Sequence, residues 1–469
     1  MIFHSYEYIL FLLTVLLVYW ALPRREQNLL LLAASYLFYG WVHAWFLWLI
    51  LCSTVTDYLC GLGMARYPQK KKALLLVSLA MNLGLLGLFK YFGFFVENVI
   101  AILEILGLPT FSNTLHILLP VGISFYTFQT LSYTIDIYRG TLKPRRNLLD
   151  FALFVAFFPQ LVAGPIERAK RLLPQIEQNR TLSPAAARDA TFLILWGFFK
   201  KLVIADNVAR YANEAFLLEQ PSFYLIWAGV FAFSIQIFAD FSAYTDIARG
   251  SARLLGFQLM PNFNHPYMAR SPADFWKRWH MSLSYWIRDY VYIPLGGSRG
   301  GAIRNSTALL VTFLLCGLWH GASWNYVIWG AYHGVLILSF RLVGGLLPDS
   351  LSKIRLLTPL RILFMFILTN IGWMIFREVD AFYLIRYLTT SPFGVSDFEL
   401  HAGLFIFYKT FLFSLPIWIH ALYARLRGPL FGNRSRPVVA INLLASMVMI
   451  LGMLTLKHAQ AFDFIYFQF

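Results

Sequence analysis

Residues 223–247 read FYLIWAGVFAFSIQIFADFSAYTDI, and this stretch decides the fold class. It is longer than the roughly 20 apolar residues that an α-helix needs to cross a bilayer, and Asp240 and Asp246 are its only charged residues. Similar apolar runs recur along nearly the whole chain, at about 8–22, 29–50, 46–65, 73–96, 116–137, 150–163, 190–205, 306–320, 324–340, 357–376, 403–423 and 438–456. We therefore expect an all-α polytopic membrane protein with roughly 11–13 transmembrane helices.

The composition supports this fold class and excludes an ordinary soluble enzyme. Of the 469 residues, 59% are apolar and only 13% are charged, about half the charged share of soluble proteins. The net charge is +16, and the basic residues gather in short loops such as Arg24-Arg25, Lys70–Lys72, Arg145-Arg146 and the segment 425–436. Cytoplasmic retention of basic loops explains this pattern, so we expect membrane lipid and not nucleic acid as the partner of these charges.

The chain is expected to form one integral-membrane domain with three parts: N-terminal helices over 1–163, a core over 164–345 and C-terminal helices over 346–469. Segments 164–189 and 249–305 mix charged residues, Pro and Gly with short apolar stretches, which predicts re-entrant or interfacial helices. Irregular backbone at membrane depth needs protein or a water-filled cavity around it, so the core is the natural place for a site.

No metal site or cleaved targeting segment is predicted. The three cysteines lie inside apolar runs, without the spacing of a disulfide framework or a zinc site. Met1 to Leu22 lacks the basic start and the cleavage site of a signal peptide, so we expect a retained helix.

Residues 273–290 read ADFWKRWHMSLSYWIRDY and combine three Trp with four basic or imidazole side chains. On one continuous helix, Trp276 and His280 would be i and i+4, as would Ser284 and Arg288. One interpretation is an interfacial helix with an aromatic belt and basic anchors. The other is the lining of a site for an anionic, purine-bearing cosubstrate.

Residues 314–326, LLCGLWHGASWNY, place His320 and Asn325 inside a long apolar run. If Arg304 and Arg341 both face the cytoplasm, the two arms form a hairpin, and His320 lies roughly 24 Å along it. An intramembrane ionisable residue is a functional candidate, and neutral imidazole can act as a general base. The alternative is a histidine that pins the hairpin through a hydrogen bond. For His333, on the second arm, packing is the favoured interpretation.

The polar residues Asp240, Ser242 and Asp246 share the apolar run 223–247. Buried carboxylates need cationic partners, so we expect Arg or Lys from elsewhere to pair with both aspartates in a scaffold role. The sequence GGSRG at 296–300 matches the G-x-S-x-G pattern of hydrolases, but the helical surroundings argue against a nucleophile elbow.

Several motifs in one order resemble the membrane-bound O-acyltransferases, in particular the branch with the membrane subunit of alginate O-acetyltransferase. They are FWKRWHMSLS (275–284), RDY (288–290), LGG (295–297), LWHG (318–321), WGAYHG (329–334), LPVGISFY (119–126) and FIYFQF (464–469). Ala243 and Thr245 depart from the Gly and Ser that relatives often have in this part of the chain.

The resemblance implies a helical funnel in a bacterial inner membrane, where an acyl donor enters from the cytoplasm. It implies His320 as the catalytic histidine and His280 as a second histidine of the core motif. The donor would be acetyl-CoA or a similar thioester, used as a cosubstrate with no bound cofactor. We expect Lys277, Arg278, Arg288 and Arg299 to hold its phosphorylated part.

The leading hypothesis is an O-acetyltransferase subunit that passes acetyl towards an extracytoplasmic polysaccharide such as alginate, cellulose, another exopolysaccharide or peptidoglycan. A partner protein would complete the transfer, and the aromatic tail Phe464–Phe469 is a candidate docking segment. The alternative is a transporter or lipid-carrier flippase with a polar path through the core. Transporters often have matching broken helices in two halves, whereas polarity here gathers in the central third.

Overall fold

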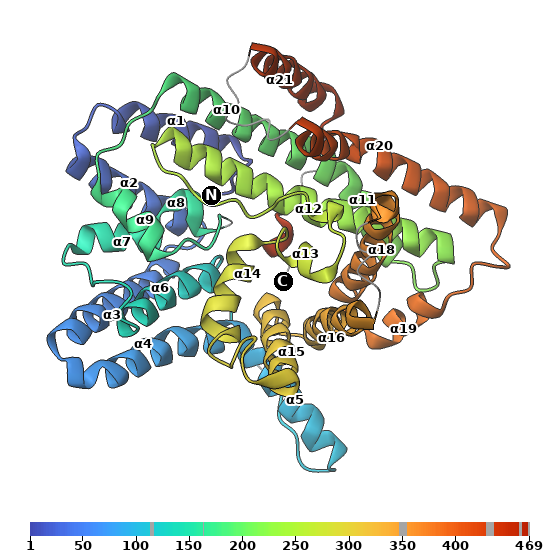
Figure 1. Cartoon of the computed structure of the whole chain (residues 1–469), viewed down its shortest axis with the longest axis horizontal. Helices are drawn as coiled ribbons and strands as arrows, with labels where there is room; N and C mark the ends of the chain where they lie inside the picture. Colours follow the sequence, from blue (N-terminus) through green and yellow to red (C-terminus); the bar gives the residue numbers. More distant parts are fainter. Residues whose placement is uncertain (113–116, 163, 347–353, 428–435, 459–461, 468–469) are drawn as a thin grey trace. The chain divides into compact units, whose positions relative to one another are not determined.

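The computed structural model describes residues 1–469 except 113–116, 163, 347–353, 428–435, 459–461 and 468–469 (Figure 1). Regular secondary structure in the described part is helical throughout. The chain divides into two compact units: unit 1 holds Met1–Ala190 and Ala248–Met260, and unit 2 holds Thr191–Ile247 and Pro261–Phe469. The single domain expected from the sequence stays a prediction.

Unit 1 contains helices whose starts are set by local capping. The Ser5 side chain accepts a hydrogen bond from the Tyr8 N–H, and Asn147 does the same for the Leu149 N–H. The helices are α1 (Tyr6–Tyr19), α2 (Arg24–Gly40), α3 (Phe46–Arg66), η1 (Pro68–Lys70), α4 (Lys71–Leu86), η2 (Gly87–Tyr91), α5 (Phe92–Ile105), α6 (Ile123–Tyr138), α7 (Leu148–Ala156), α8 (Phe158–Leu161), α9 (Ala169–Glu177) and the start of α10 (Pro184–Phe199).

Unit 2 contains the helices that carry the sequence-predicted site residues. They are η3 (Lys200–Ala205), α11 (Asp206–Phe216), α12 (Phe223–Leu254, whose last turns belong to unit 1), η4 (Pro266–Met268), α13 (Pro272–Trp276), α14 (Met281–Ile287), η5 (Arg288–Tyr292), α15 (Gly301–His320), α16 (Trp324–Leu346), η6 (Arg355–Leu357), α18 (Thr358–Arg377), α19 (Ala381–Thr389), α20 (Asp397–Arg427), α21 (Arg436–Leu456) and η7 (Ile465–Phe467). The short helices between α12 and α15 agree with the prediction that segment 249–305 is too broken to span, except that α12 continues to Leu254 and α15 already begins at Gly301.

Eight helical stretches of the described residues are long and apolar enough to cross a membrane, so the chain is a polytopic helical membrane protein. This number is below the 11–13 expected, because several apolar runs form helices of fewer than 18 residues, such as α1 with 14, α2 with 17 and α6 with 16. The spans begin with α3, the continuous stretch Pro68–Ile105 and α12, and continue with α15, α16, α18, α20 and α21.

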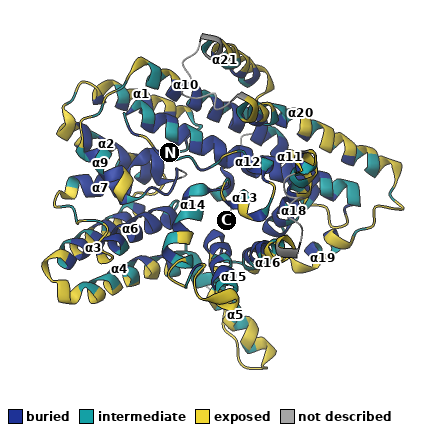
Figure 2. Cartoon of the chain, viewed as in Figure 1, coloured by how far each residue is buried: buried dark blue, intermediate teal, exposed yellow. Residues whose placement is uncertain are grey.

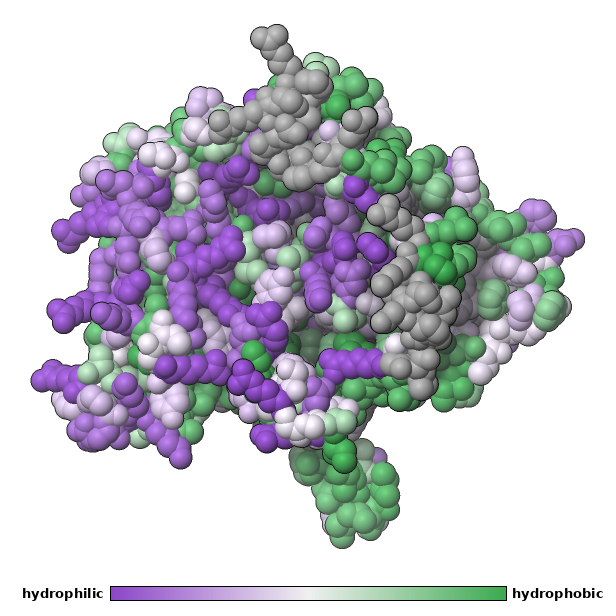
Figure 3. Space-filling view, in the orientation of Figure 1, coloured by the Kyte–Doolittle hydropathy of each residue, from purple (hydrophilic) through white to green (hydrophobic). Residues whose placement is uncertain are grey.

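Burial separates interior spans from lipid-facing ones. In α12, 89% of the spanning window is buried inside the protein, against 11% in α21 (Figure 2). The surface of α5 is hydrophobic, as Figure 3 shows, in keeping with a helix that faces lipid. Polar side chains on α12 are therefore enclosed by protein, where each needs a partner.

Helices α15 and α16 form the hairpin predicted around His320. Their backbones approach closely at two glycines: a Cβ on Gly317 would lie 2.0 Å from the Tyr326 carbonyl oxygen, and one on Gly330 would lie 2.2 Å from that of Phe313. No larger residue fits at either position without moving a backbone. The glycines therefore fix the register that sets His320, at the end of α15, beside the start of α16.

Candidate functional site

His320 is the last residue of α15 and is 4% exposed. Its ring lies among aromatic rings from three elements, with centroid distances of 5.0 Å to Trp319, 5.0 Å to Trp329 of α16 and 5.4 Å to Phe376 of α18. The hydroxyl oxygen of Tyr466 lies 3.5 Å from His320 Nδ1, at the outer limit of a hydrogen bond. The imidazole thus lies among aromatic rings, with the Tyr466 hydroxyl as a polar neighbour.

The polar contact comes from the C-terminal segment, which belongs to unit 2. Phe464 and Ile465 are fully buried. The Phe464 ring stacks on Tyr244 at 3.9 Å, and the Tyr466 ring lies 4.3 Å from Phe241, both on α12. Burial raises the pKa of the Tyr466 phenol well above its ordinary value, so the phenol stays protonated at neutral pH.

Lys201 of η3 binds this segment to α12. Its Nζ donates to the Phe462 carbonyl at 2.7 Å and forms ion pairs with Asp240 at 3.1 Å and Asp206 at 2.9 Å. Asp240 in turn accepts the Ile465 N–H at 2.7 Å. Burial alone would lower the pKa of Lys201, but the two carboxylates outweigh it and raise the pKa, so the lysine stays charged. One buried cation therefore joins α11, α12 and the C-terminal segment.

These contacts correct the expectation that the tail is an exposed docking segment. The expected exposure is wrong for Phe464 and Ile465, which are buried, because Lys201 and Asp240 bind the backbone and the Phe464 ring stacks on Tyr244. Tyr466 is partly exposed, and docking of a partner on this segment stays a prediction. Residues 468–469 of that tail lie outside the described part.

His280 lies at a break between two short helices, not inside one continuous helix as the sequence predicted. α13 ends at Trp276 and α14 begins at Met281, so Trp276 and His280 do not share a helix. His280 has φ +39°, in the left-handed region, and is fully buried. The break is stabilised by the Asn262 side chain, whose Oδ1 accepts the Ser282 hydroxyl at 2.6 Å.

The structure brings His280 and His320 to the same aromatic groups. The His280 ring lies 5.8 Å from Trp319 and 6.3 Å from Tyr466, while Phe241 is at 4.8 Å. Burial lowers the pKa of His280 to about 3, so its imidazole is neutral at physiological pH. A neutral His280 can orient its neighbours without adding charge.

His333 lies in the aromatic packing between α13, α16 and α18. It is 1% exposed and contacts Phe275 at 6.1 Å, Trp276 at 5.2 Å and Trp329 at 4.8 Å between ring centroids. Asn325 also has a structural contact, since its Nδ2 donates to the Phe376 carbonyl at 2.9 Å. Both residues therefore contact residues whose rings surround His320: His333 contacts Trp329, and Asn325 binds Phe376.

Ser242 and Asp246, the other two polar residues of α12 singled out in the sequence, pair with Lys200, the neighbour of Lys201. Lys200 Nζ lies 2.7 Å from an Asp246 carboxylate oxygen and donates to the Ser242 hydroxyl at 2.8 Å. Asp240 and Asp246 therefore both have lysine partners, as the sequence predicted for buried carboxylates.

Of the four cations predicted to hold the donor, two form ion pairs with neighbouring carboxylates and two are exposed. Arg278 pairs with Asp274 at 2.7 Å, and Arg288 pairs with Asp289 at 2.7 Å. Lys277 and Arg299 are exposed. The structure thus leaves their role in donor binding a prediction.

The glycine-rich segment 296–300 has no strand before it and is not a nucleophile elbow. Gly296 and Gly300 have positive φ, and Arg304 packs on both: a Cβ there would lie within 3 Å of the Arg304 side chain. Within the described residues, no group of three His, Cys, Asp or Glu is arranged to hold a metal ion.

Lys201 is the main site-related residue that sequence reasoning missed. The signal was present, since Lys200 and Lys201 interrupt the apolar run 190–205 just as Asp240 interrupts its own run. Two lysines and two aspartates in apolar runs predict pairing, although only the fold shows which pairs form. The contact of Tyr466 with His320 has no local signal, because the residues are 146 positions apart.

Fold and site together define a polytopic helical membrane protein with a buried histidine beside a phenol. A model of the membrane-bound O-acyltransferase family matches residues 143–378. The chain is 44% identical over 405 residues to the probable alginate O-acetylase AlgI of Azotobacter vinelandii, covering 85% of this chain and 79% of the relative. It is 35% identical over 381 residues to the peptidoglycan O-acetyltransferase of Helicobacter pylori, covering 75% and 71%.

A more distant match is the teichoic acid D-alanyltransferase of Bacillus subtilis, 31% identical over 236 residues, with 47% of this chain and 58% of the relative covered. The chain belongs to the membrane-bound O-acyltransferase family and is an acyltransferase. This membership supports the enzyme hypothesis over the transporter or flippase alternative.

Proposed function

We propose that this protein is an acetyltransferase subunit of the bacterial inner membrane that takes acetyl from a cytoplasmic thioester, acetyl-CoA or a similar donor, for O-acetylation of an extracytoplasmic polysaccharide. The observation that carries the proposal is the position of His320: a buried imidazole at the turn of a membrane hairpin, 3.5 Å from the Tyr466 hydroxyl. The relatives named for alginate and peptidoglycan acetylation support a polysaccharide acceptor.

In the proposed reaction His320 acts as the general base. The acceptor hydroxyl gives its proton to the imidazole while its oxygen forms a bond to the thioester carbonyl carbon. The tetrahedral intermediate then collapses, the carbon–sulfur bond breaks and the thiolate takes a proton from the imidazolium. The aromatic cage excludes water from the thioester, and a neutral His280 keeps the site free of a competing charge.

The donor is expected to be a cosubstrate, with no bound cofactor. Lys277 and Arg299 are exposed cations that suit its phosphate groups, while Arg278 and Arg288 would have to exchange their carboxylate partners for phosphate. Because Phe464 and Ile465 are buried, we expect the extracytoplasmic partner protein to bind mainly at other residues.

The test is acetyl transfer from radiolabelled acetyl-CoA by the full chain in nanodiscs, with a glycan acceptor and with water alone. We expect the wild type to consume the thioester and His320→Ala to lose this activity while its thermal unfolding stays cooperative. A wild type that binds glycan without consuming any thioester contradicts the proposal. So does a folded His320→Ala variant with the wild-type rate.

A further inference from the structure

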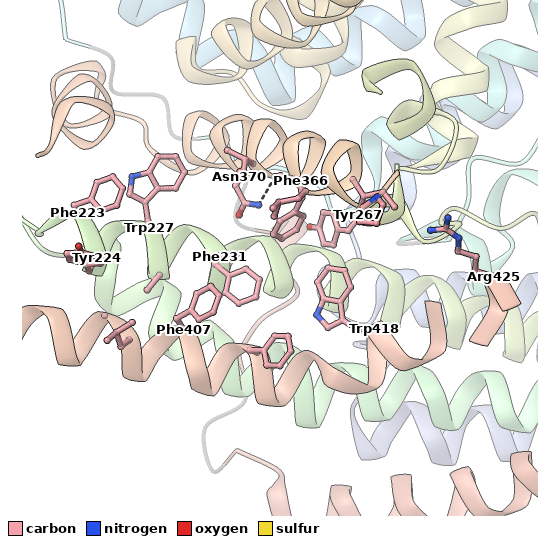
Figure 4. A pocket seen from close by; sticks show the side chains of 18 residues that line it. Phe223, Tyr224, Trp227, Phe231, Tyr267, Phe366, Asn370, Phe407, Trp418 and Arg425 are labelled. Carbon is pink, nitrogen blue, oxygen red and sulfur yellow. Dashed lines mark hydrogen bonds between the residues drawn. The ribbon is translucent and has the colours of Figure 1, made fainter. Parts of the chain in front are cut away.

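Three spanning helices of unit 2, α12, α18 and α20, line an apolar groove whose lining residues do not include His320 (Figure 4). Its volume is about 830 Å³, within the range of about 300–1,000 Å³ found for ligand sites. Because all three helices are long and apolar enough to cross the membrane, the groove lies at the depth of the bilayer.

The walls of the groove are suited to hydrocarbon. Phe231 of α12 packs on Phe407 of α20 at 4.9 Å, and Phe366 of α18 lies 5.8 Å from Trp418. The amide of Asn370 donates to the Phe366 carbonyl within its own helix. The walls thus offer hydrocarbon contacts along most of the groove.

The groove opens to the outside of the protein. Leu363, Leu404 and Phe407 line it and keep 55%, 53% and 50% of their surface exposed. At bilayer depth such surface is covered by lipid or by another apolar helix. What distinguishes these occupants is the chemistry at the end of the groove.

Arg425 lines the end of the groove opposite Phe223 and Trp227 (Figure 4). Within the described part of the chain, no residue forms an ion pair or hydrogen bond with its guanidinium. From Gly403 to Arg425 the rise of α20 is about 33 Å, close to the thickness of the hydrocarbon core, about 30 Å. A chain that fills the groove therefore meets a cation where lipid head groups begin.

We propose that this groove binds a membrane phospholipid with an anionic head group, whose acyl chain fills the aromatic channel and whose phosphate contacts Arg425. Guanidinium binds phosphate oxygens in bidentate fashion, and a cation near the membrane surface favours anionic lipid. The basic segment after Arg425 is predicted to face the cytoplasm, so the lipid comes from the cytoplasmic leaflet. The site is independent of the acetyl transfer proposed above.

The experiment measures lipid retained by the purified full chain with native mass spectrometry, after exposure to equal amounts of phosphatidylglycerol and phosphatidylethanolamine. We expect the wild type to retain phosphatidylglycerol in preference and Arg425→Gln to reduce this preference about fivefold. Arg341→Gln is the matched control, since Arg341 is an exposed arginine near the end of α16 that does not line the groove. It should keep the wild-type preference.

A second pair of variants tests the channel itself. Leu363→Trp places a bulky ring in the groove and should lower retention of both lipids. Leu360→Trp should not, because Leu360 is exposed to a similar extent on the same helix but does not line the groove. Equal retention of both lipids by the wild type overturns the proposal, as does an unchanged preference in Arg425→Gln. A wild-type dimer that Leu363→Trp converts to monomer would overturn it too, because the groove would then hold a second copy of the chain.

Discussion

His320 and His333 lie on the two helices of one hairpin, and both rings contact the same Trp329, yet their surroundings differ in kind. His320 faces a hydroxyl brought from the end of the chain, and His333 faces aromatic rings on Phe275 and Trp276. Their exposures, 4% and 1%, do not separate them. The difference teaches that burial in a membrane helix makes a histidine a candidate for catalysis. The group that its ring faces then indicates whether its role is catalysis or packing.

The largest expected effect comes from replacing each histidine by Phe. His320→Phe keeps the aromatic volume but removes the base, so the acetyl transfer rate should fall by a factor of about 10² to 10⁴. His333→Phe should retain most of the rate, because the site it occupies is formed by aromatic rings. Rates of thioester consumption in nanodiscs test both variants. An equal loss of rate in both would contradict the assignment of catalysis to His320 and of packing to His333.

The second prediction removes the cation that holds Tyr466 beside His320. Lys201→Met leaves Asp206 and Asp240 buried without their cation, which should cost about 3–5 kcal/mol of stability. Lys200→Met is the control, because its partner Asp246 keeps 15% of its side chain exposed and can be hydrated. Thermal unfolding in detergent should show a markedly larger loss for Lys201→Met. Equal losses would mean that the contacts of Lys201 with the C-terminal segment contribute little.

A smaller effect is expected from the phenol itself. Tyr466→Phe keeps the ring on Phe241 and removes only the hydroxyl that faces His320 Nδ1. A hydrogen bond contributes about 0.5–1.5 kcal/mol, so the transfer rate should fall by a factor of roughly 2 to 10, and any loss of stability should not exceed that amount. The same substitution at Tyr332, whose hydroxyl bonds to the Leu368 carbonyl, should leave the rate unchanged. If Tyr466→Phe transfers acetyl at the wild-type rate, the Tyr466 hydroxyl does not contribute to the reaction at His320.

The last prediction concerns pH. The pKa of His280 is about 3 in the folded protein against an ordinary value near 6.5, so between these values the unfolded chain binds the extra proton. Stability is therefore lost as the pH falls below 6.5, by at most about 1.4 kcal/mol per pH unit. His280→Asn, which tolerates the left-handed backbone, should flatten this dependence between pH 6.5 and 5. A variant as pH-sensitive as the wild type would exclude His280 as the source.

The sequence predicts the hairpin that carries His320 and His333, but it does not predict the contact of Tyr466 with His320. The apolar runs predict the helices, and Gly317 and His320 lie in a hairpin that charge placement alone indicates. The break at Lys277–His280 was not predictable from helical spacing, since the pattern of Trp and Arg fits a helix and only the backbone shows φ +39° at His280. Tyr466 was visible as part of a motif, but its place beside His320 depends on ion pairs formed by distant residues.

The contact between Tyr466 and His320 also has a consequence for biosynthesis. The two residues are 146 positions apart, and a ribosome that adds about 5–20 residues per second needs roughly 7 to 30 s to pass from one to the other. During that interval the hairpin has already been made while the segment that closes on it has not. A newly made chain therefore passes through a state in which Tyr466 has not yet reached His320, and η7 supplies this contact once it is translated.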